Sequence, residues 1–189
     1  MARAGIGDRV EGFHAVAAAV KAGRASSVMI EQRRLKGIAY TGLADAARSA
    51  GAHVEYVSDV RDQASTSAPQ GVVAVCRPKQ TVSIEDAVAT TDPAALLVFD
   101  HLDDQRNMGA AIRSSVAAGL RSVVVPKRRA APIGAAAFKT AAGALEEVSL
   151  VEVSSIPEAL RRLEQLGVWR VGLDGACLLY TSDAADDRY

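Results

Sequence analysis

Asn107, Gly109 and Arg113 are the residues whose types and spacing could do chemistry. They follow a polar stretch, residues 100–106, and Asn107 is expected to be a helix N-cap because an Asn side chain accepts a free backbone N–H. A helix N-terminus offers such N–H groups and partial positive charge to an anion, and Arg113 lies about two turns farther along. Gly109 would let a ligand or another backbone approach the first turn. The alternative is structural, with a capping Asn and a solvated Arg.

The elements around these residues form a βαβ pattern. The apolar run at residues 94–99 is short enough for a buried strand, and an Ala-rich helix is expected over residues 108–118 with Gly119 as its C-terminal stop. Three valines at residues 123–125 predict a second buried strand. Strand, helix and strand in this short span are typical of a right-handed crossover between parallel strands, and ligands bind beyond the carboxyl ends of such strands.

The run from Asn107 to Arg113 resembles the first signature motif of the SpoU (TrmH-like) RNA ribose 2′-O-methyltransferases of the SPOUT superfamily. The family pattern is close to D-x-x-N-x-G-x-x-x-R-x-x-x-x-x-G, and its fixed positions are occupied by Asp104, Asn107, Gly109, Arg113 and Gly119. A second segment, KTAAGALE at residues 139–146, resembles the family pattern K-x-x-x-G-A-x-E. The resemblance covers roughly residues 7–175.

This resemblance implies transfer of a methyl group from S-adenosyl-L-methionine to a ribose 2′-OH of RNA, with 23S rRNA favoured over tRNA. It implies that Arg113 and Asn107 are catalytic residues beside the reacting hydroxyl. Unless its pKa is strongly perturbed, a guanidinium (pKa above about 12) cannot accept a proton, so Arg113 is expected to stabilise the developing oxyanion and hold the 3′ phosphate. Asn107 would orient Arg113 or the ribose by hydrogen bonds. The reaction needs no metal, and a homodimer is expected for a full-length member.

The first part of the chain alternates helices and strands. Helices are expected at residues 13–22 and 42–50, and strands at residues 27–31, 54–57 and 71–76. The last strand is apolar nearly throughout and is therefore expected to be central. The entry VEGFHAVAAAVKAG and the exit APQGVVAV resemble the small RNA-binding domain, akin to ribosomal protein L30e, that precedes the catalytic domain in many SpoU enzymes. Pro69 stands where the usual exit has His, which leaves the role of this segment open.

Basic residues gather at two places. With 22 basic and 22 acidic residues the chain has no net charge, so an RNA site must be a local patch. The RNA-contact candidates are Arg33, Arg34 and Lys36 in the first part and Lys127, Arg128 and Arg129 after the strand at residues 123–125. A solvated loop is the alternative for both, and no aromatic residue stands beside the first cluster in the sequence. His14 could pair with RNA, although its place next to an apolar helix face favours a partly buried position.

The predicted fold is α/β with two domains. Residues 1–77 are expected to form the L30e-like domain, residues 78–93 a linker with a short helix at 84–89, and residues 94–175 the first part of a parallel-sheet SPOUT (α/β knot) domain. In that part helices at 135–144 and 156–166 alternate with strands at 148–153 and 168–173. Residues 176–189 match nothing in the family and are expected to be a foreign tail.

Family members continue with a G-x-E-x-x-G loop and an I-P-M…S-L-N-V-S run, which thread the trefoil knot and carry most contacts to the methyl donor. Neither pattern is in the sequence, so no cofactor-binding residue is predicted and this chain is expected to be an inactive fragment lacking the knot portion. The alternative is an RNA-binding protein without catalysis. A generic nucleotide-binding domain is less well supported, because no P-loop and no G-x-G-x-x-G occurs.

The cysteines and the distribution of apolar residues predict the cellular compartment. Cys76 and Cys177 lack the spacing of metal ligands and are expected to be free thiols rather than a disulfide. No apolar run approaches the ~18 residues of a membrane span, and the N-terminus has no signal-peptide pattern. The cytoplasm is therefore the expected location.

Overall fold

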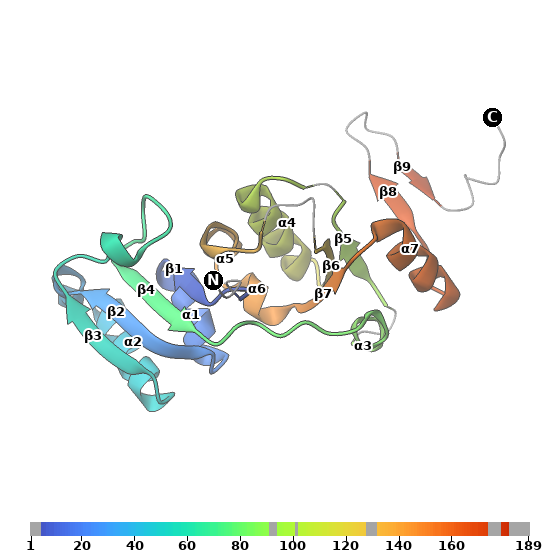
Figure 1. The fold of residues 1–189 in the computed structure, drawn as a ribbon. Coiled ribbons are helices and arrows are strands. Elements are labelled where there is room, and N and C mark those ends of the chain that lie inside the picture. Colours follow the sequence, from blue (N-terminus) through green and yellow to red (C-terminus); the bar gives the residue numbers. More distant parts are fainter. Residues whose placement is uncertain (1–4, 91–93, 101, 128–131, 174–178, 182–189) are drawn as a thin grey trace.

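The computed structural model describes residues 5–90, 94–100, 102–127, 132–173 and 179–181. Four strands form a mixed sheet in the N-terminal domain: β1 (Arg9–Glu11), β2 (Ala25–Glu31), β3 (His53–Val57) and β4 (Val72–Cys76). Their order is β1-β4-β2-β3, with β2 and β3 parallel and β4 antiparallel to both of its neighbours (Figure 1). β4 is therefore an interior strand, as its apolar sequence predicts.

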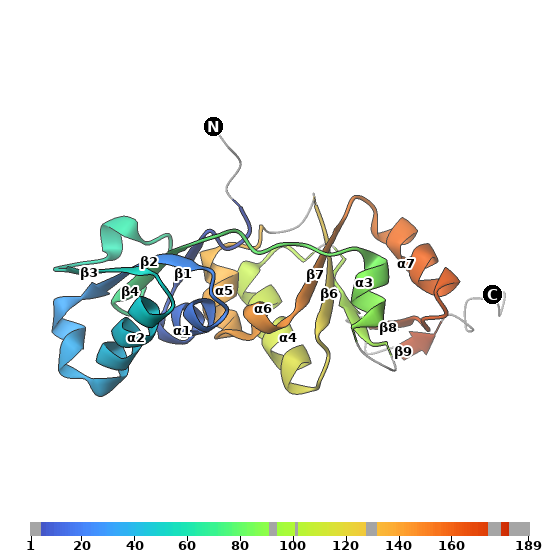
Figure 2. The same ribbon diagram turned by 90° about the horizontal axis from the view of Figure 1, so that it is seen from below.

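Two helices, α1 (Phe13–Lys21) and α2 (Ile38–Ser49), lie on one side of this sheet (Figure 2). Their buried side chains, such as Val20 and Leu43, join Ile30 of β2 and Val72 of β4 in one apolar cluster. Val75, which points to the opposite face of β4, is exposed. Two 3-10 turns, η1 (Gln32–Lys36) and η2 (Arg61–Gln63), complete this domain.

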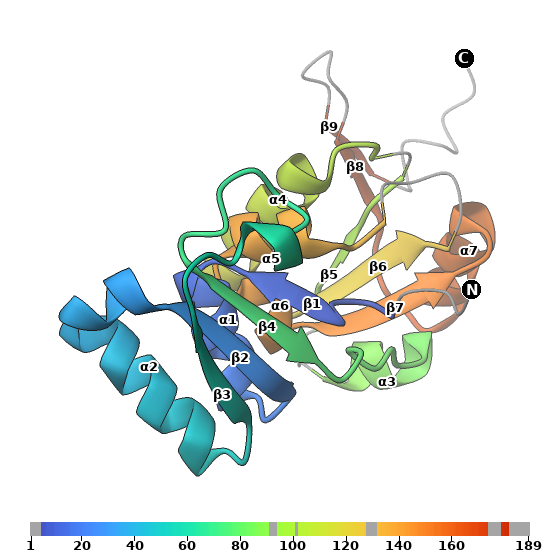
Figure 3. The same cartoon turned by 60° about the vertical axis from the view of Figure 1, so that its left-hand side comes forward.

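Three strands form a parallel sheet in the second domain: β5 (Leu96–Val98), β6 (Ser122–Pro126) and β7 (Ser149–Val153). We call this domain the parallel-sheet domain. Their order is β5-β6-β7, and Figure 3 shows β6 and β7 running side by side in the same direction. Five helices surround this sheet: α3 (Ile84–Ala89), α4 (Gln105–Ala117), α5 (Ala135–Ala141), α6 (Ala144–Glu147) and α7 (Ile156–Gln165). A separate antiparallel pair joins β8 (Val171–Leu173) to β9 (Leu179–Thr181).

The helices divide between the two faces of the parallel sheet. Val123 and Val125 of β6 contribute to the cluster that contains residues of α4, α5 and α6. Val124, between them, packs with residues of α3 and α7 on the other face. This alternation places α4, α5 and α6 on the side that faces the N-terminal domain, as Figure 2 shows.

The buried core continues from one domain into the other. Phe138 of α5 is 1% exposed, and a side chain at Gly7 of the N-terminal segment would collide with its ring. The Arg24 guanidinium lies over the same ring, 5.4 Å from its centroid. Helix α5 also packs against β1 and α1. The two domains therefore share one apolar interior rather than meeting through the linker alone.

The structure confirms the predicted α/β fold class and changes several element limits. The linker helix, α3, has the expected bounds, and Gly119 ends α4 with a φ of 89°. The strand β1 was missed because it is only three residues long. The single helix expected at 135–144 is wrong, since Ala142 and Gly143 have positive φ values of 50° and 101° and split it into α5 and α6.

The expected strand at 168–173 is shortened to β8, and it pairs with β9 instead of extending the parallel sheet. No helix among the described residues is both long and apolar enough to cross a bilayer.

Candidate functional site

The predicted N-cap of α4 is wrong, because the helix starts earlier than expected. Asp104 is the N-cap, with extended backbone angles, and its Oδ1 accepts hydrogen bonds from the backbone N–H of Arg106 (2.6 Å) and of Asn107 (3.4 Å). Asn107 is instead the third residue of the helix, so its side-chain amide is released from capping. A carboxylate is also a better cap here than an amide, since it complements the helix dipole.

Gly109 sets the distance between α4 and α5. A Cβ at this position would clash with the carbonyl oxygen of Ala137 and would lie 3.0 Å from both the Ala141 nitrogen and the Thr140 Cβ. Gly109 therefore admits the backbone of α5, one of the two possibilities that its place in the motif suggested. The close packing fixes the axis of α4, and with it the direction in which its polar face points.

Asn107 and Arg113 lie on the exposed side of α4. Met108 and Ile112, their neighbours in sequence, are fully buried, so the helix is anchored by one face and presents the other. Within the described residues neither side chain takes part in a hydrogen bond or ion pair, and none joins them to each other. An amide in the first turn of α4, next to the carboxyl edge of the parallel sheet, is thus available to a ligand. A guanidinium with unused donors lies about two turns farther along the same helix.

The KTAAGALE segment has the opposite environment, because its polar residues bind the N-terminal domain. The Lys139 ammonium donates to the carbonyl of Ala68 and to the Thr66 hydroxyl (3.3 Å). Gly143 has a φ of 101°, and a Cβ there would lie 2.9 Å from the Cβ of Ala18 on α1. Lys139 and Gly143 therefore hold α5 and α6 against the first domain.

Glu146 completes this junction with a two-bond ion pair. Its Oε2 and Oε1 accept from Nε (2.8 Å) and Nη2 (2.5 Å) of Arg24, and the two side chains are only 5% and 12% exposed. Arg24 also donates to the carbonyls of Gly7 (3.1 Å) and Arg77. The Lys79 ammonium donates to the Glu146 carbonyl (3.3 Å), and burial lowers the pKa of Lys79 while the Glu146 carboxylate opposes that shift.

These contacts make the second motif a domain junction. Sequence reasoning missed Arg24, and no local pattern could have found it, because its partner lies 122 positions away. Cys76 lies at the same junction as a buried thiol, and burial raises its pKa to about 11. Cys177 falls outside the described residues.

The first basic cluster lies on η1, directly after β2, and its three members differ. Arg33 Nε donates to Oε2 of Glu31 (2.5 Å), a carboxylate that is almost fully buried. Arg34 places its guanidinium over the ring of Tyr40, with its Cζ 5.7 Å from the ring centroid, and Lys36 is exposed. This aromatic neighbour was missed because the helix was expected to start at residue 42, whereas α2 begins at Ile38 and contains Tyr40.

His14 is exposed, so its expected partly buried position is wrong. The apolar face of α1 is formed by its neighbours Ala15 and Val16, and the His14 ring meets only the edge of the Phe13 ring, at 5.4 Å between centroids.

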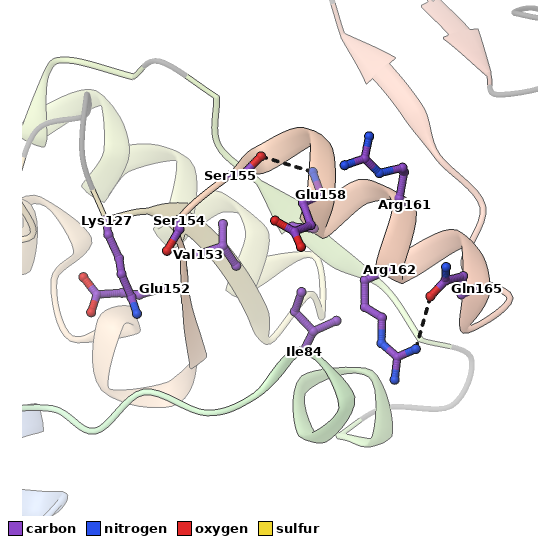
Figure 4. A pocket seen from close by; sticks show the side chains of 11 residues that line it. Ile84, Lys127, Glu152, Val153, Ser154, Ser155, Glu158, Arg161, Arg162 and Gln165 are labelled. Atoms are coloured by element: carbon purple, nitrogen blue, oxygen red, sulfur yellow. Dashed lines mark hydrogen bonds between the residues drawn. The ribbon is translucent and has the colours of Figure 1, made fainter.

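The second basic cluster is described only at Lys127, because Arg128 and Arg129 lie outside the described residues. Lys127 is exposed and follows β6, so it stands at the same sheet edge as the start of α4. It lines a cavity of about 470 Å³ between the end of β7 and α7 (Figure 4). The other charged residues around this cavity are Glu152, Glu158, Arg161 and Arg162. Charges of both signs therefore surround it.

Comparisons with known proteins show the family of the chain. The family model described as "SpoU rRNA Methylase family" matches residues 94–184, and the model "RNA 2′-O ribose methyltransferase substrate binding" matches residues 9–82. The chain is 32% identical over 186 residues to the 23S rRNA (guanosine-2′-O-)-methyltransferase RlmB of Shewanella oneidensis, an alignment covering 93% of this chain and 75% of that protein. The chain belongs to the SpoU family of RNA methyltransferases.

Other relatives are matched over a smaller part. The RlmB protein of Vibrio cholerae is 38% identical over 117 residues, which cover 60% of this chain and 47% of that relative. The chain thus spans about half the length of this curated relative. Among solved structures, the SpoU methyltransferase AviRb from Streptomyces viridochromogenes in complex with AdoMet shares the fold, with a TM-score of 0.66 at 19% identity over 84% of this chain and 58% of that one.

Proposed function

We propose that this chain belongs to an enzyme that transfers a methyl group from S-adenosyl-L-methionine to a ribose 2′-OH of RNA, with a guanosine of 23S rRNA as the substrate. The observation that carries the proposal is the pair Asn107 and Arg113, exposed and unpaired within the described residues on a helix whose other face is buried. The substrate follows from the names of the relatives. A cytoplasmic location, and a homodimeric state for a full-length protein, stay predictions.

Arg113 acts on the developing charge in this proposal. A ribose hydroxyl is a poor nucleophile and must lose its proton during attack on the methyl group. A guanidinium is normally always protonated, so Arg113 stabilises the oxyanion and holds the 3′ phosphate rather than accepting the proton. Asn107, one and a half to two turns earlier on α4, orients the ribose with its free amide. S-adenosyl-L-methionine supplies only the methyl group.

No residue of this chain is assigned to the methyl donor. The cavity beside β7 does not fit it, because charges of both signs and no aromatic ring line that cavity, whereas a flat adenine ring prefers an apolar or aromatic wall. The G-x-E-x-x-G and S-L-N patterns are not in the sequence. We therefore expect the 189-residue polypeptide to be inactive by itself.

RNA contacts are proposed for both basic clusters: Arg33, Arg34 and Lys36 on η1, and Lys127, Arg128 and Arg129 after β6. Basic side chains of this kind position the phosphate backbone and do not read its sequence. Arg33 has a structural partner in Glu31 but leaves 70% of its side chain exposed.

RNA binding without catalysis is the second candidate function for this polypeptide. The separate β8–β9 pair favours it, since these strands do not extend the parallel sheet, whose carboxyl edge is where α/β sheets bind ligands.

One experiment separates the two candidates. The purified chain is mixed with a 23S rRNA transcript and methyl-tritiated donor, and both RNA retention and tritium transfer are measured. Retention that weakens steeply with salt, without transfer, is expected for this polypeptide. Donor-dependent transfer would show that the polypeptide is active. In a version carrying the two further patterns, Arg113→Lys should abolish transfer, and an unchanged rate would remove Arg113 from the mechanism.

A further inference from the structure

Tyr40 makes three contacts that fix the position of the Arg34–Tyr40 stack. The guanidinium lies over the ring of Tyr40, and the Tyr40 hydroxyl donates to the carbonyl of Gln70 at 2.7 Å. The Tyr40 ring also contacts the Phe13 ring in a tilted arrangement, with ring centroids 5.0 Å apart. Tyr40 is half-buried against the core, so its ring has a fixed position on which the exposed Arg34 rests.

The exit segment of the N-terminal domain builds this arrangement. Gln70 has a φ of 60°, accepts from the Phe13 backbone N–H through its Oε1 (3.0 Å) and from Tyr40 through its carbonyl. At Gly71, with a φ of 76°, a Cβ would lie 2.8 Å from both Cγ and Nε of Arg34. A glycine is needed here for the stem of Arg34 to pass. The segment whose role the sequence left open thus positions the Arg34–Tyr40 stack.

A second Arg–Tyr pair in the same domain provides the contrast. Arg48 lies over Tyr56 at 5.4 Å, but its guanidinium donates to the Tyr56 hydroxyl (2.6 Å) and to Asp45 (3.1 Å). The Arg34 guanidinium makes no hydrogen bond or ion pair within the part of the chain that the structure describes. The Arg48 guanidinium thus uses its donors within its own domain. The exposed Arg34 guanidinium leaves its donors, and the face turned away from Tyr40, available to a ligand.

We propose that the outer face of the Arg34 guanidinium, backed by Tyr40, is a stacking site for an unpaired RNA base. Planar guanidinium groups and aromatic rings bind the faces of bases, and only bases in loops, bulges and single strands expose those faces. Lys36, exposed two residues farther on, contacts the adjoining phosphate. The site rests on the RNA binding that both candidate functions share and adds to it the class of RNA, one with unpaired nucleotides.

The test compares two RNAs and conservative variants of the whole chain. Fluorescence anisotropy measures binding to a labelled hairpin with an unpaired loop and to a blunt duplex of the same stem sequence. Arg34→Lys keeps the charge and removes the plane, so affinity for the hairpin should fall about fivefold or more while duplex affinity is unchanged. Arg48→Lys is the matched control and should change neither affinity. Tyr40→Leu should act like Arg34→Lys, whereas Tyr40→Phe keeps the ring and the preference for the loop.

The outcomes separate this site from the proposed function. Equal binding by Arg34→Lys and the wild-type chain would overturn the stacking site while RNA binding stands. A loss of affinity by Arg34→Lys that is the same on both RNAs would also overturn it, because it would show a phosphate contact only. A wild-type chain that binds neither RNA would overturn the stacking site, whereas retention of the 23S rRNA transcript tests the proposed function separately. Arg34 is exposed, so its variant tests the site even where Tyr40→Leu fails to fold.

Discussion

The polar residues of α4 and those of the α5–α6 segment differ in what they contact, although both belong to motifs of the same family. On α4, Asn107 and Arg113 face outward and have no partner among the described residues. On the α5–α6 segment, Lys139 and Glu146 are paired with groups of the N-terminal domain. Each motif also contains a glycine that admits a neighbouring helix: Gly109 brings α5 to α4, and Gly143 brings α6 to α1.

This difference teaches how the two motifs divide their tasks. A charged side chain that is already bonded and buried contributes to the fold, and using it in a reaction would first cost those bonds. A charged side chain held on a rigid helix with unused donors is ready to bind a ligand. The α4 motif is thus the candidate site, and the α5–α6 motif fixes the domain that would bring RNA to it.

Breaking the junction should have the largest effect. Glu146→Ala leaves the buried Arg24 guanidinium without its carboxylate and should lower the free energy of unfolding by about 3–5 kcal/mol. Urea denaturation followed by circular dichroism measures the change. The matched control is Glu147→Ala, whose pair with Arg121 is about half exposed and should be worth about 1 kcal/mol or less. Equal effects of the two changes would contradict the junction.

Overpacking the contact between α4 and α5 comes next. Gly109→Ala places a methyl group against the Ala137 carbonyl and should destabilise the fold by roughly 1–3 kcal/mol. Gly42→Ala in α2 is the control, because a Cβ there meets nothing within 4 Å. That change should instead stabilise the helix by about 0.5–1 kcal/mol. Thermal unfolding distinguishes the two signs, and a neutral Gly109→Ala would mean that α4 is not held by this contact.

The thiol at the junction predicts a smaller effect that depends on pH. Burial raises the pKa of Cys76 from 9.0 to about 11, so the folded state disfavours the thiolate. The stabilisation is complete below pH 9 and should be lost as the pH rises toward 11. Unfolding curves across this range are compared for Cys177→Ser and for Cys177→Ser with Cys76→Ala. The double variant should lack the loss of stability that the Cys76 thiol causes between pH 9 and 11. Parallel pH profiles of the two proteins would refute the raised pKa of Cys76.

The smallest stability effects are expected at the candidate site. Arg113→Lys and Asn107→Ala should each change the free energy of unfolding by no more than about 0.5 kcal/mol, because both side chains are exposed and unpaired among the described residues. Denaturation under the conditions used for Glu146→Ala gives the comparison. A large loss of stability at either position would show that the α4 motif, like the α5–α6 motif, serves the fold.

The sequence predicted well what depends on local pattern. The βαβ unit follows from two apolar runs and an Ala-rich helix with a glycine stop, and β6 and α4 appear where these patterns lie. The interior place of β4 follows from its unbroken apolar run. The motif residues Asn107 and Arg113 were singled out by the family resemblance, because spacing alone fits a capping Asn and a solvated Arg equally well, and their role stays a prediction.

The errors arose where tertiary contacts or a choice between similar residues decided the outcome. Asp104 and Asn107 can both cap a helix, and only the extended backbone at Asp104 settles which one does. The Arg24–Glu146 pair and the Arg34–Tyr40 stack join residues whose neighbours give no sign of a partner. Such pairs are set by how whole elements pack, which local periodicity does not contain.

The 122 positions between Arg24 and Glu146 also bear on how the chain folds during its synthesis. At the usual pace of translation, Arg24 is added to the chain roughly 6–24 s before its carboxylate partner. Over that interval the surface of α1 that later receives Gly143, and the N-terminal segment at Gly7 that later meets Phe138, stay open to water and to other chains. A nascent N-terminal domain would therefore be most prone to aggregation and proteolysis before α6 emerges, and its folding would finish only with that helix.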